Sequence, residues 1–336
     1  MIKFADLFSG IGGFHLAATE IKTHKLQLAG FSEIDPNCIK IYKKAFGLFN
    51  GVSFGDIRDL VSGKQNEWGL PQFDLCFAGF PCQPFSNVGK RLGLEDNRSN
   101  VFFDLVRAIN YYKPRYFVFE NVEKIKTIEK GRVLYEIIKR LEKAGYKVDI
   151  QSLSAENYGL PHQRKRLFFC GRRKKRGSKT RKLQVPAPQS LFQAQYPSTW
   201  HLLEKTMPKN HIVPNGSRHT IFTRNSKWMG DLEIDRAIAR PLCATMGKWH
   251  RANQDNYFSE KYVFSKNGKK PQNIDFFKDN IRRITLLEAL RLQGFPDMFV
   301  NIYRELKIAA TPAYKTIGNA VPVNLASVVL DNLLNE

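Results

Sequence analysis

The chain has 336 residues, of which 43% are hydrophobic and 25% charged, and its 53 Lys and Arg against 31 Asp and Glu give a formal net charge of +22. A chain of this length can bury a large core, and it contains no apolar run of about 18 residues or more, so we expect a globular protein without a transmembrane helix. The positive charge favours a polyanionic partner, most commonly nucleic acid.

The N-terminal part, residues 1–172, alternates strand-like and helix-like patterns. Helical signals include 35–46, where Asp35 is placed to cap and Pro36 to start a helix, and 131–145, which stops at a glycine. This alternation predicts an α/β fold, a mostly parallel sheet with helices on both faces, whose ligands bind at the carboxyl ends of the strands. The strand-like segments are 2–8, 26–34, 52–57, 73–79, 115–121, 148–155 and 166–171.

The pattern changes beyond residue 172. Pro, Asn, Gly and Trp become frequent over 183–280, which predicts a second, smaller and irregular domain. Order returns where Thr285 and Glu288 form a capping-box pattern, and a glycine and a proline then end the predicted helix. The N-terminus lacks the layout of a signal peptide, so we expect an intracellular protein.

The positive charge is concentrated in one segment. The run 161–182 holds 11 Lys or Arg and no acid. A solvated, disordered loop is one interpretation of such a run, and a phosphate-contacting segment is the favoured one.

The five cysteines form no C-x-x-C pair, which argues against a disulfide framework or a zinc site. Three of them lie in apolar or helical patterns typical of buried thiols.

A glycine-rich turn, "DLFSGIGGF" (6–14), separates the first strand from the first helix. Alone it is a weak signal, because such glycines can simply make a tight turn. Glu33 follows the second strand, where a carboxylate can bind ribose hydroxyls, and Asp56 follows the third, where it can accept from an adenine amino group. The combination fits a nucleoside cofactor, and the G-x-G-G spacing disfavours NAD.

Three further features end neighbouring strands. Cys82, in "GFPCQPFSNVG" (79–89), lies on a loop stiffened by two prolines. Glu120 closes the apolar run of the next strand, where an ordinary surface glutamate is the alternative. Arg164 and Arg166 lie two residues apart, on one face of a predicted strand, which taken alone indicates only a basic edge strand.

Taken together, these motifs resemble the DNA (cytosine-5)-methyltransferases of bacterial restriction–modification systems. The resemblance rests on "DLFSGIGGF", "GFPCQPFS", "FENV", "QRKR", "RRITLLEALRLQGFP" and "YKTIGNAVP", in the family's order. It implies the class I S-adenosylmethionine-dependent methyltransferase fold plus a target-recognition domain. The Thr-Leu pair that the family tends to carry in that domain has only Pro241-Leu242 as a counterpart. The implied domains are 1–172 with 300–336 for catalysis and cofactor binding, 173–280 for target recognition, and a connecting helix region at 281–299.

The resemblance also implies a mechanism. Cys82, as thiolate, adds to carbon 6 of a flipped-out cytosine and so makes carbon 5 nucleophilic toward the methyl group of S-adenosylmethionine, which leaves as S-adenosylhomocysteine. Glu120 contacts the base and donates a proton, Arg164 and Arg166 orient the base, and Asn121 braces the thiol loop. No metal is implied. The segment 86–100 is expected to close over the flipped base.

The residues carried over from the family fall into two further groups. The cofactor-binding residues are Phe8, Ser9, Gly10, Ile11, Gly12, Gly13, Glu33, Ile34, Asp56, Ile57, Phe80, Asn319 and Val321. The DNA-binding residues are Gln83, Ser86, Arg98, Arg172, Arg173, Lys174 and Lys175. The expected partner is double-stranded DNA, with a cognate restriction endonuclease that shares the site without a stable complex. We expect a monomer in the bacterial cytoplasm and no membrane partner.

Two alternatives remain at this point. A transfer RNA cytosine-5 methyltransferase would keep the chemistry, although the Cys-Phe-Thr string typical of that branch is here Cys76-Phe77-Ala78. A non-enzymatic DNA-binding regulator would explain the charge, but it would need neither Cys82 nor Glu120.

Overall fold

The computed structural model describes residues 1–48, 53–61, 71–81, 101–174, 196–222, 233–247 and 254–335. The chain forms two compact units. Unit 1 consists of Met1–Leu153, Lys165–Ala187 and Leu325–Glu336, and unit 2 of Ser154–Arg164 and Pro188–Asn324. The domain boundaries implied by the family resemblance stay a prediction.

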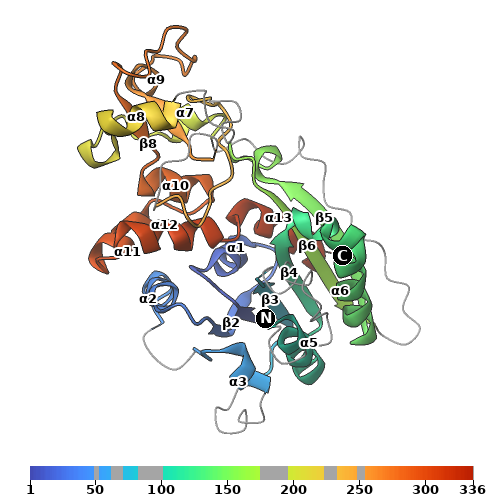
Figure 1. Ribbon diagram of the computed structural model, residues 1–336. Coiled ribbons are helices and arrows are strands. Elements are labelled where there is room, and N and C mark those ends of the chain that lie inside the picture. The colour runs from blue at the N-terminus through green and yellow to red at the C-terminus, as the bar shows by residue number, and fades with distance from the viewer. Residues whose placement is uncertain are drawn as a thin grey trace. The chain divides into compact units, whose positions relative to one another are not determined.

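A six-stranded sheet forms the centre of unit 1 (Figure 1). Its strands are β1 (Ile2–Leu7), β2 (Leu26–Ser32), β3 (Leu75–Gly79), β4 (Tyr116–Val122), β5 (Tyr146–Ser154) and β6 (Lys165–Arg173). The order is β2-β1-β3-β4-β6-β5. β1 pairs in parallel with β2 and β3, and β3 with β4, whereas β6 runs antiparallel to β4. The mostly parallel sheet predicted from the sequence is confirmed.

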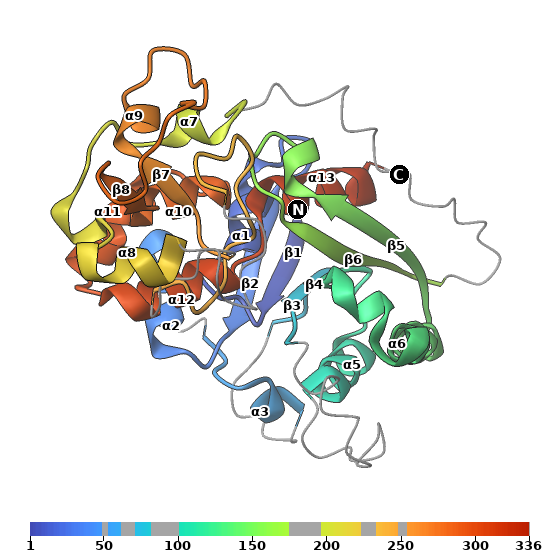
Figure 2. The same ribbon diagram turned by 45° about the horizontal axis from the view of Figure 1, so that its top comes forward.

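Helices cover both faces of this sheet. They are α1 (Gly13–Glu20), α2 (Pro36–Ala45), α3 (Ile57–Val61), α5 (Val101–Tyr112), α6 (Arg132–Lys143) and α13 (Val323–Leu334), with the short 3-10 helices η2 (Glu123–Lys126) and η3 (Ile128–Gly131). Figure 2 shows α5 and α6 on one side of the sheet and α1 and α13 on the other. On the α1 side, the Ser327 hydroxyl of α13 donates to Glu20 of α1 at 2.6 Å.

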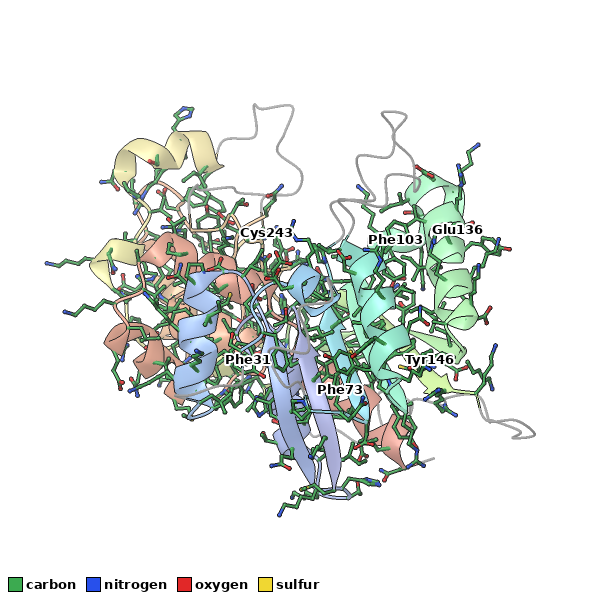
Figure 3. The ribbon with its side chains drawn as sticks, turned by 90° about the horizontal axis from the view of Figure 1, so that it is seen from below. Phe31, Phe73, Phe103, Glu136, Tyr146 and Cys243 are labelled. Carbon is green, nitrogen blue, oxygen red and sulfur yellow. The ribbon has the colours of Figure 1, made fainter. Side chains whose placement is uncertain are left out.

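Alternating strand residues supply the two layers of the core, because successive side chains of a strand point to opposite faces. Ala5 and Cys76 belong to the apolar cluster that α5 and α6 complete. Phe77 instead stacks on Phe14 of α1, with 5.0 Å between ring centroids. Figure 3 shows Phe31 on the α2 side of the sheet, away from Phe103 of α5.

The predicted third strand, 52–57, is reduced in the structure to a single parallel bridge between Ser53 and Phe31. Gly55 then adopts a left-handed backbone with φ 64°, which interrupts an extended run, and α3 begins at Ile57. Asp56 nevertheless follows this bridge at the sheet edge, as the sequence predicted.

Local capping signals were read correctly. The Asp35 carboxylate accepts the Asn37 N–H at the start of α2, whose first residue is a proline. Thr285 and Glu288 form a complete capping box at the start of α10 (Leu286–Leu292). After that helix, Gly294 has φ 79°, which terminates it as expected.

Unit 2 is built from short elements. They are η4 (Ala155–Asn157), α7 (Thr199–Leu202), η5 (Lys209–His211), α8 (Asn215–Phe222), β7 (Tyr257–Ser259), α9 (Glu260–Val263), β8 (Ile281–Arg283), α10, α11 (Met298–Glu305) and α12 (Ala310–Asn319). β7 and β8 pair antiparallel. Their Tyr257 and Ile281 pack with Val213 and Phe222 in a small apolar core.

One stretch, Ala310–Leu334, is long and apolar enough to span a membrane by length and composition. However, 72% of its most apolar window is buried inside the fold. Its apolar side chains are therefore already in use as core, as in a buried helix of a globular protein.

Candidate active site

The glycine-rich turn after β1 has an unusual backbone. Phe8, Gly10 and Gly12 all have positive φ, at 53°, 55° and 92°. Glycine adopts this region readily, whereas Phe8 does so at a cost in free energy. The turn is held by hydrogen bonds from the Ser9 N–H to the Ser32 carbonyl at 3.0 Å and from the Gly12 N–H to the Ser9 carbonyl at 2.9 Å.

Glu33, expected to bind ribose, also holds this turn. Its Oε2 accepts the Gly10 N–H at 2.8 Å, and its Oε1 accepts the amides of Ile34 and Asp35 at 2.8 and 2.9 Å. Because a carboxylate oxygen can accept two hydrogen bonds, Oε2 keeps capacity for a further donor. A Cβ built on Gly10 would meet no atom within 4 Å, so the turn borders open space beside that oxygen.

The other predicted cofactor residues of unit 1 lie near the same sheet edge. Asp56 forms an ion pair with the exposed Arg58, which lowers the pKa of the Asp56 carboxyl. The side chain of Ile34 is 69% exposed, as an apolar contact for a ligand would be. By contrast, Ile11, Ile57 and Phe80 are buried.

Glu120 and Arg166 form a nearly buried ion pair. The Arg166 Nε lies 2.6 Å from the Glu120 Oε1, and the two side chains are 13% and 9% exposed. β4 places Glu120 near its carboxyl end, and the neighbouring strand β6 brings Arg166 opposite Val122. Two of the four predicted catalytic residues are therefore in direct contact at the edge of the sheet where ligands of such folds bind.

Asn121 braces the segment that leads to the thiol, as the sequence suggested. Its side-chain amide donates to the Phe80 carbonyl at 3.1 Å, and its Oδ1 accepts the Val122 N–H at 2.8 Å. Cys82 itself lies outside the described residues. The same holds for four predicted DNA contacts, Gln83, Ser86, Arg98 and Lys175.

Arg164 contacts backbone carbonyls in the structure. It is 1% exposed, and its guanidinium donates to the carbonyls of Gly318 at 2.9 Å, Ala320 at 2.7 Å and Leu242 at 3.3 Å, all within unit 2. These contacts put a positive charge at the C-terminal end of α12, where the last carbonyls of a helix need donors. Arg164 thus supports the 318–320 segment, and its implied role in orienting the base stays a prediction.

That segment carries two more predicted cofactor residues. Asn319 is exposed and Val321 is nearly buried, and both belong to unit 2. The buried Gln293 adds support, since its amide donates to the Ile317 carbonyl at 2.7 Å. Their contact with a cofactor stays a prediction.

The first residues of the basic run are engaged in the fold. Arg172 is nearly buried and pairs with Asp149 at 3.4 Å. The Arg173 guanidinium donates to the Lys113 carbonyl at 3.1 Å. Arg172 lies opposite Tyr116, the first residue of β4, about 13 Å along the strand from Glu120. Arg172 is therefore engaged within unit 1, whereas Arg173 and Lys174 are exposed. DNA contact by all three residues stays a prediction.

Sequence reasoning missed one buried group behind the turn. The Tyr42 hydroxyl donates to the Asp6 Oδ2 at 3.2 Å and contacts the His15 Nδ1 at 2.9 Å. Burial raises the pKa of the Asp6 carboxyl well above its usual range and lowers the pKa of His15 to about 4. The only available signal was a carboxylate inside the apolar run "KFADLF".

Three described thiols are structural. Cys38, Cys76 and Cys170 are buried, and burial raises the pKa of the Cys76 thiol. They match the inert thiols expected from their apolar surroundings. Cys243 is partly exposed.

The sheet order, the glycine-rich turn and the Glu120–Arg166 pair at the strand ends define an α/β methyltransferase fold. The family model of C-5 cytosine-specific DNA methylases matches residues 2–335, so the chain belongs to this family. It is a DNA (cytosine-5)-methyltransferase, as the motifs predicted.

Two relatives support the same conclusion. The Type II methyltransferase M1.ScrFI of Lactococcus lactis subsp. cremoris is 32% identical over 346 residues, which cover 99% of this chain and 78% of that protein. The Type II methyltransferase M.HpaII of Haemophilus parainfluenzae is 32% identical over 331 residues, covering 95% and 86%. Such relatives favour an enzyme acting on DNA over either alternative raised by the sequence.

Solved structures share the fold. The S. pombe Dnmt2 methyltransferase superposes with a TM-score of 0.76 at 20% identity, covering 100% of this chain and 99% of that one. The Entamoeba histolytica methyltransferase EhMeth gives 0.71 at 17% identity, covering 100% and 98%. At these identities the likeness concerns the fold alone.

Proposed function

We propose that this DNA (cytosine-5)-methyltransferase uses S-adenosylmethionine and acts on a flipped-out cytosine through a covalent adduct at Cys82. The observation that carries the proposal is the Glu120–Arg166 pair, because it places an acid and a cation at the end of β4. The adjacent Asn121 fixes the Phe80 carbonyl, two residues before the thiol.

The turn fits the proposed cofactor. Glu33 retains acceptor capacity beside open space at Gly10, which suits ribose hydroxyls, and the exposed Ile34 suits an adenine face. When bound, S-adenosylmethionine supplies an electrophilic methyl group. Asp56 would accept from the adenine amino group if its exposed partner Arg58 releases one carboxylate oxygen.

The thiol provides the nucleophile. Carbon 5 of cytosine is too electron-poor to attack a methyl donor, so Cys82 as thiolate forms a bond to carbon 6 and raises the electron density at carbon 5. Once carbon 5 carries the methyl group and loses its proton, the bond between the sulfur and carbon 6 breaks and the thiolate is restored. An ordinary cysteine titrates near ~8.5, so a nearby cation is needed to favour the thiolate at neutral pH.

Glu120 and Arg166 would act on the base. A protonated Glu120 carboxyl would donate to N3 of the cytosine as the thiol adds to carbon 6, which offsets the charge that develops on the ring. Arg166 holds this carboxyl through Nε and donates to the Lys165 carbonyl through Nη1, and its remaining nitrogen would donate to the base carbonyl.

The target cytosine must leave the duplex for this chemistry, because a stacked cytosine exposes neither face of its ring.

We assign target recognition to 173–280 and catalysis to 1–172 with 300–336, joined by 281–299. The protein would act as a monomer in the cytoplasm. A cognate endonuclease is expected, although one relative over 51% of the chain is an orphan methyltransferase of Bacillus phage rho11s.

Covalent trapping tests the proposal. A duplex library with 5-fluorocytosine in place of cytosine should form a denaturant-resistant adduct in the presence of S-adenosylmethionine, since fluorine cannot leave carbon 5 as a proton does. Cys82→Ser should form none, while Cys243→Ser, which removes another accessible thiol, should trap like the wild type. Methylation of ordinary DNA by an enzyme that never traps would refute the covalent mechanism.

A further inference from the structure

Tyr42 links the two ends of the glycine-rich turn. Its hydroxyl lies 3.2 Å from the Oδ2 of Asp6, which precedes the turn on β1, and 2.9 Å from the Nδ1 of His15, which follows the turn on α1. Tyr42 itself comes from α2 and is fully buried, as is Asp6. A single hydroxyl thus connects three separate elements of unit 1.

The two hydrogen bonds of the Tyr42 hydroxyl form a chain from His15 through Tyr42 to Asp6. The Tyr42 hydroxyl donates to Asp6, so its oxygen is available to accept from a His15 ring that carries its proton on Nδ1. Burial lowers the pKa of His15 to about 4, so the ring is neutral at pH 7. The Asp6 carboxyl interacts with the His15 backbone as well as with the Tyr42 hydroxyl, which is its side-chain partner.

Packing reinforces this link. The His15 ring stacks on Phe46 with 3.7 Å between centroids. A Cβ on Gly12 would come within 2.3 Å of Phe46 and 3.1 Å of Tyr42, so only glycine lets the turn approach α2 this closely. The end of α2 and the turn therefore pack closely together.

The turn needs such support because its backbone is strained. Phe8 adopts φ 53° without the freedom of glycine, and two further positions of the turn are left-handed. Conformations of this kind persist only where the surrounding structure imposes them. Hydrogen bonds to Glu33 and Ser32 hold the solvent side of the turn, and the Tyr42 link holds its buried side.

We propose that Tyr42 is a positioning residue for cofactor binding, which keeps the glycine-rich turn in its binding conformation through Asp6 and His15. The inference rests on the proposed function, since it takes the turn to be the cofactor site. Tyr42 is buried behind the turn and acts through it rather than by touching the cofactor.

Tyr42→Phe removes only the hydroxyl, and Tyr146→Phe is a matched control. Tyr146 is a buried tyrosine of the same unit whose hydroxyl donates to the Pro114 carbonyl at 2.9 Å, at the opposite end of β4 (Figure 3). Both variants should melt at a lower temperature. Only Tyr42→Phe should weaken S-adenosylmethionine binding in isothermal titration, by about ten-fold, or ~1.4 kcal/mol.

Steady-state kinetics distinguish a loss of cofactor binding from a loss of stability, because lower stability alone would not change the KM for S-adenosylmethionine. The KM for S-adenosylmethionine should rise by about ten-fold in Tyr42→Phe while kcat stays within about two-fold, as expected for lost ground-state binding. If Tyr42→Phe does not fold, His15→Phe keeps the ring stack, removes the donor and decides the question in the same way. Equal affinities for the variants and the wild type would overturn the inference. A wild type that binds no S-adenosylmethionine would instead refute the proposed function.

Discussion

Replacement of Arg164 separates the two roles considered for it. Its guanidinium makes two short charge-assisted hydrogen bonds, to Gly318 and Ala320, and a longer one to Leu242. Hydrogen bonds to a charged group contribute about 1.5–3 kcal/mol each, so Arg164→Ala should cost roughly 3–5 kcal/mol. Arg164→Lys keeps the charge but can serve fewer carbonyls, so it should cost about 2 kcal/mol.

Urea unfolding, followed by tryptophan fluorescence, measures this loss. With a slope of about 1–3 kcal/mol per molar urea, Arg164→Lys should lower the midpoint by roughly 1 M. In the absence of urea, turnover per trapped active site should stay within a few-fold of the wild type. Arg166→Lys is the control, because it should leave the midpoint nearly unchanged and reduce turnover at least ~10-fold. If Arg164→Lys kept full stability and lost turnover by ~100-fold, our assignment of Arg164 to structural support would be refuted.

Two further predictions concern carboxylates. Glu120→Gln keeps the shape of the side chain beside Arg166 but cannot deliver a proton. Single-turnover methylation should therefore slow by about 100-fold, while DNA affinity hardly changes. A normal methylation rate would mean that Glu120 is only structural. Burial raises the pKa of Asp235 to about 6, above about 3.9 in the unfolded chain, so the native state binds this proton more tightly. Its contribution to stability should therefore fall as the pH rises from about 4 to about 6, by up to about 3 kcal/mol. Comparison with Asp235→Asn in urea titrations isolates this contribution.

The sequence predicted features that depend on neighbouring residues. The Asp35 cap, the Thr285–Glu288 capping box and the alternation behind the parallel sheet all follow from local patterns. The 52–57 strand was overestimated, because a left-handed Gly55 interrupts it.

The surroundings of several side chains depend on long-range contacts, which the sequence alone did not predict. Arg164 and Arg166 were expected on one strand face, but β6 begins at Lys165, so Arg164 lies before the strand and its guanidinium is committed to carbonyls of unit 2. Arg172 was predicted to contact DNA as part of the basic run, and no local pattern in the sequence revealed that it pairs with Asp149 in the structure. The Tyr42 link joins residues 36 and 27 positions apart, which no local pattern reveals.

The central claim is sequence-specific methylation of cytosine carbon 5 through Cys82. Bisulfite sequencing of plasmid DNA from cells that express the wild type or Cys82→Ser tests it most directly. The account predicts protected cytosines confined to one short sequence with the wild type, and none with the variant at equal protein levels. Protection that survives Cys82→Ser, or its absence with folded wild-type protein, would contradict it.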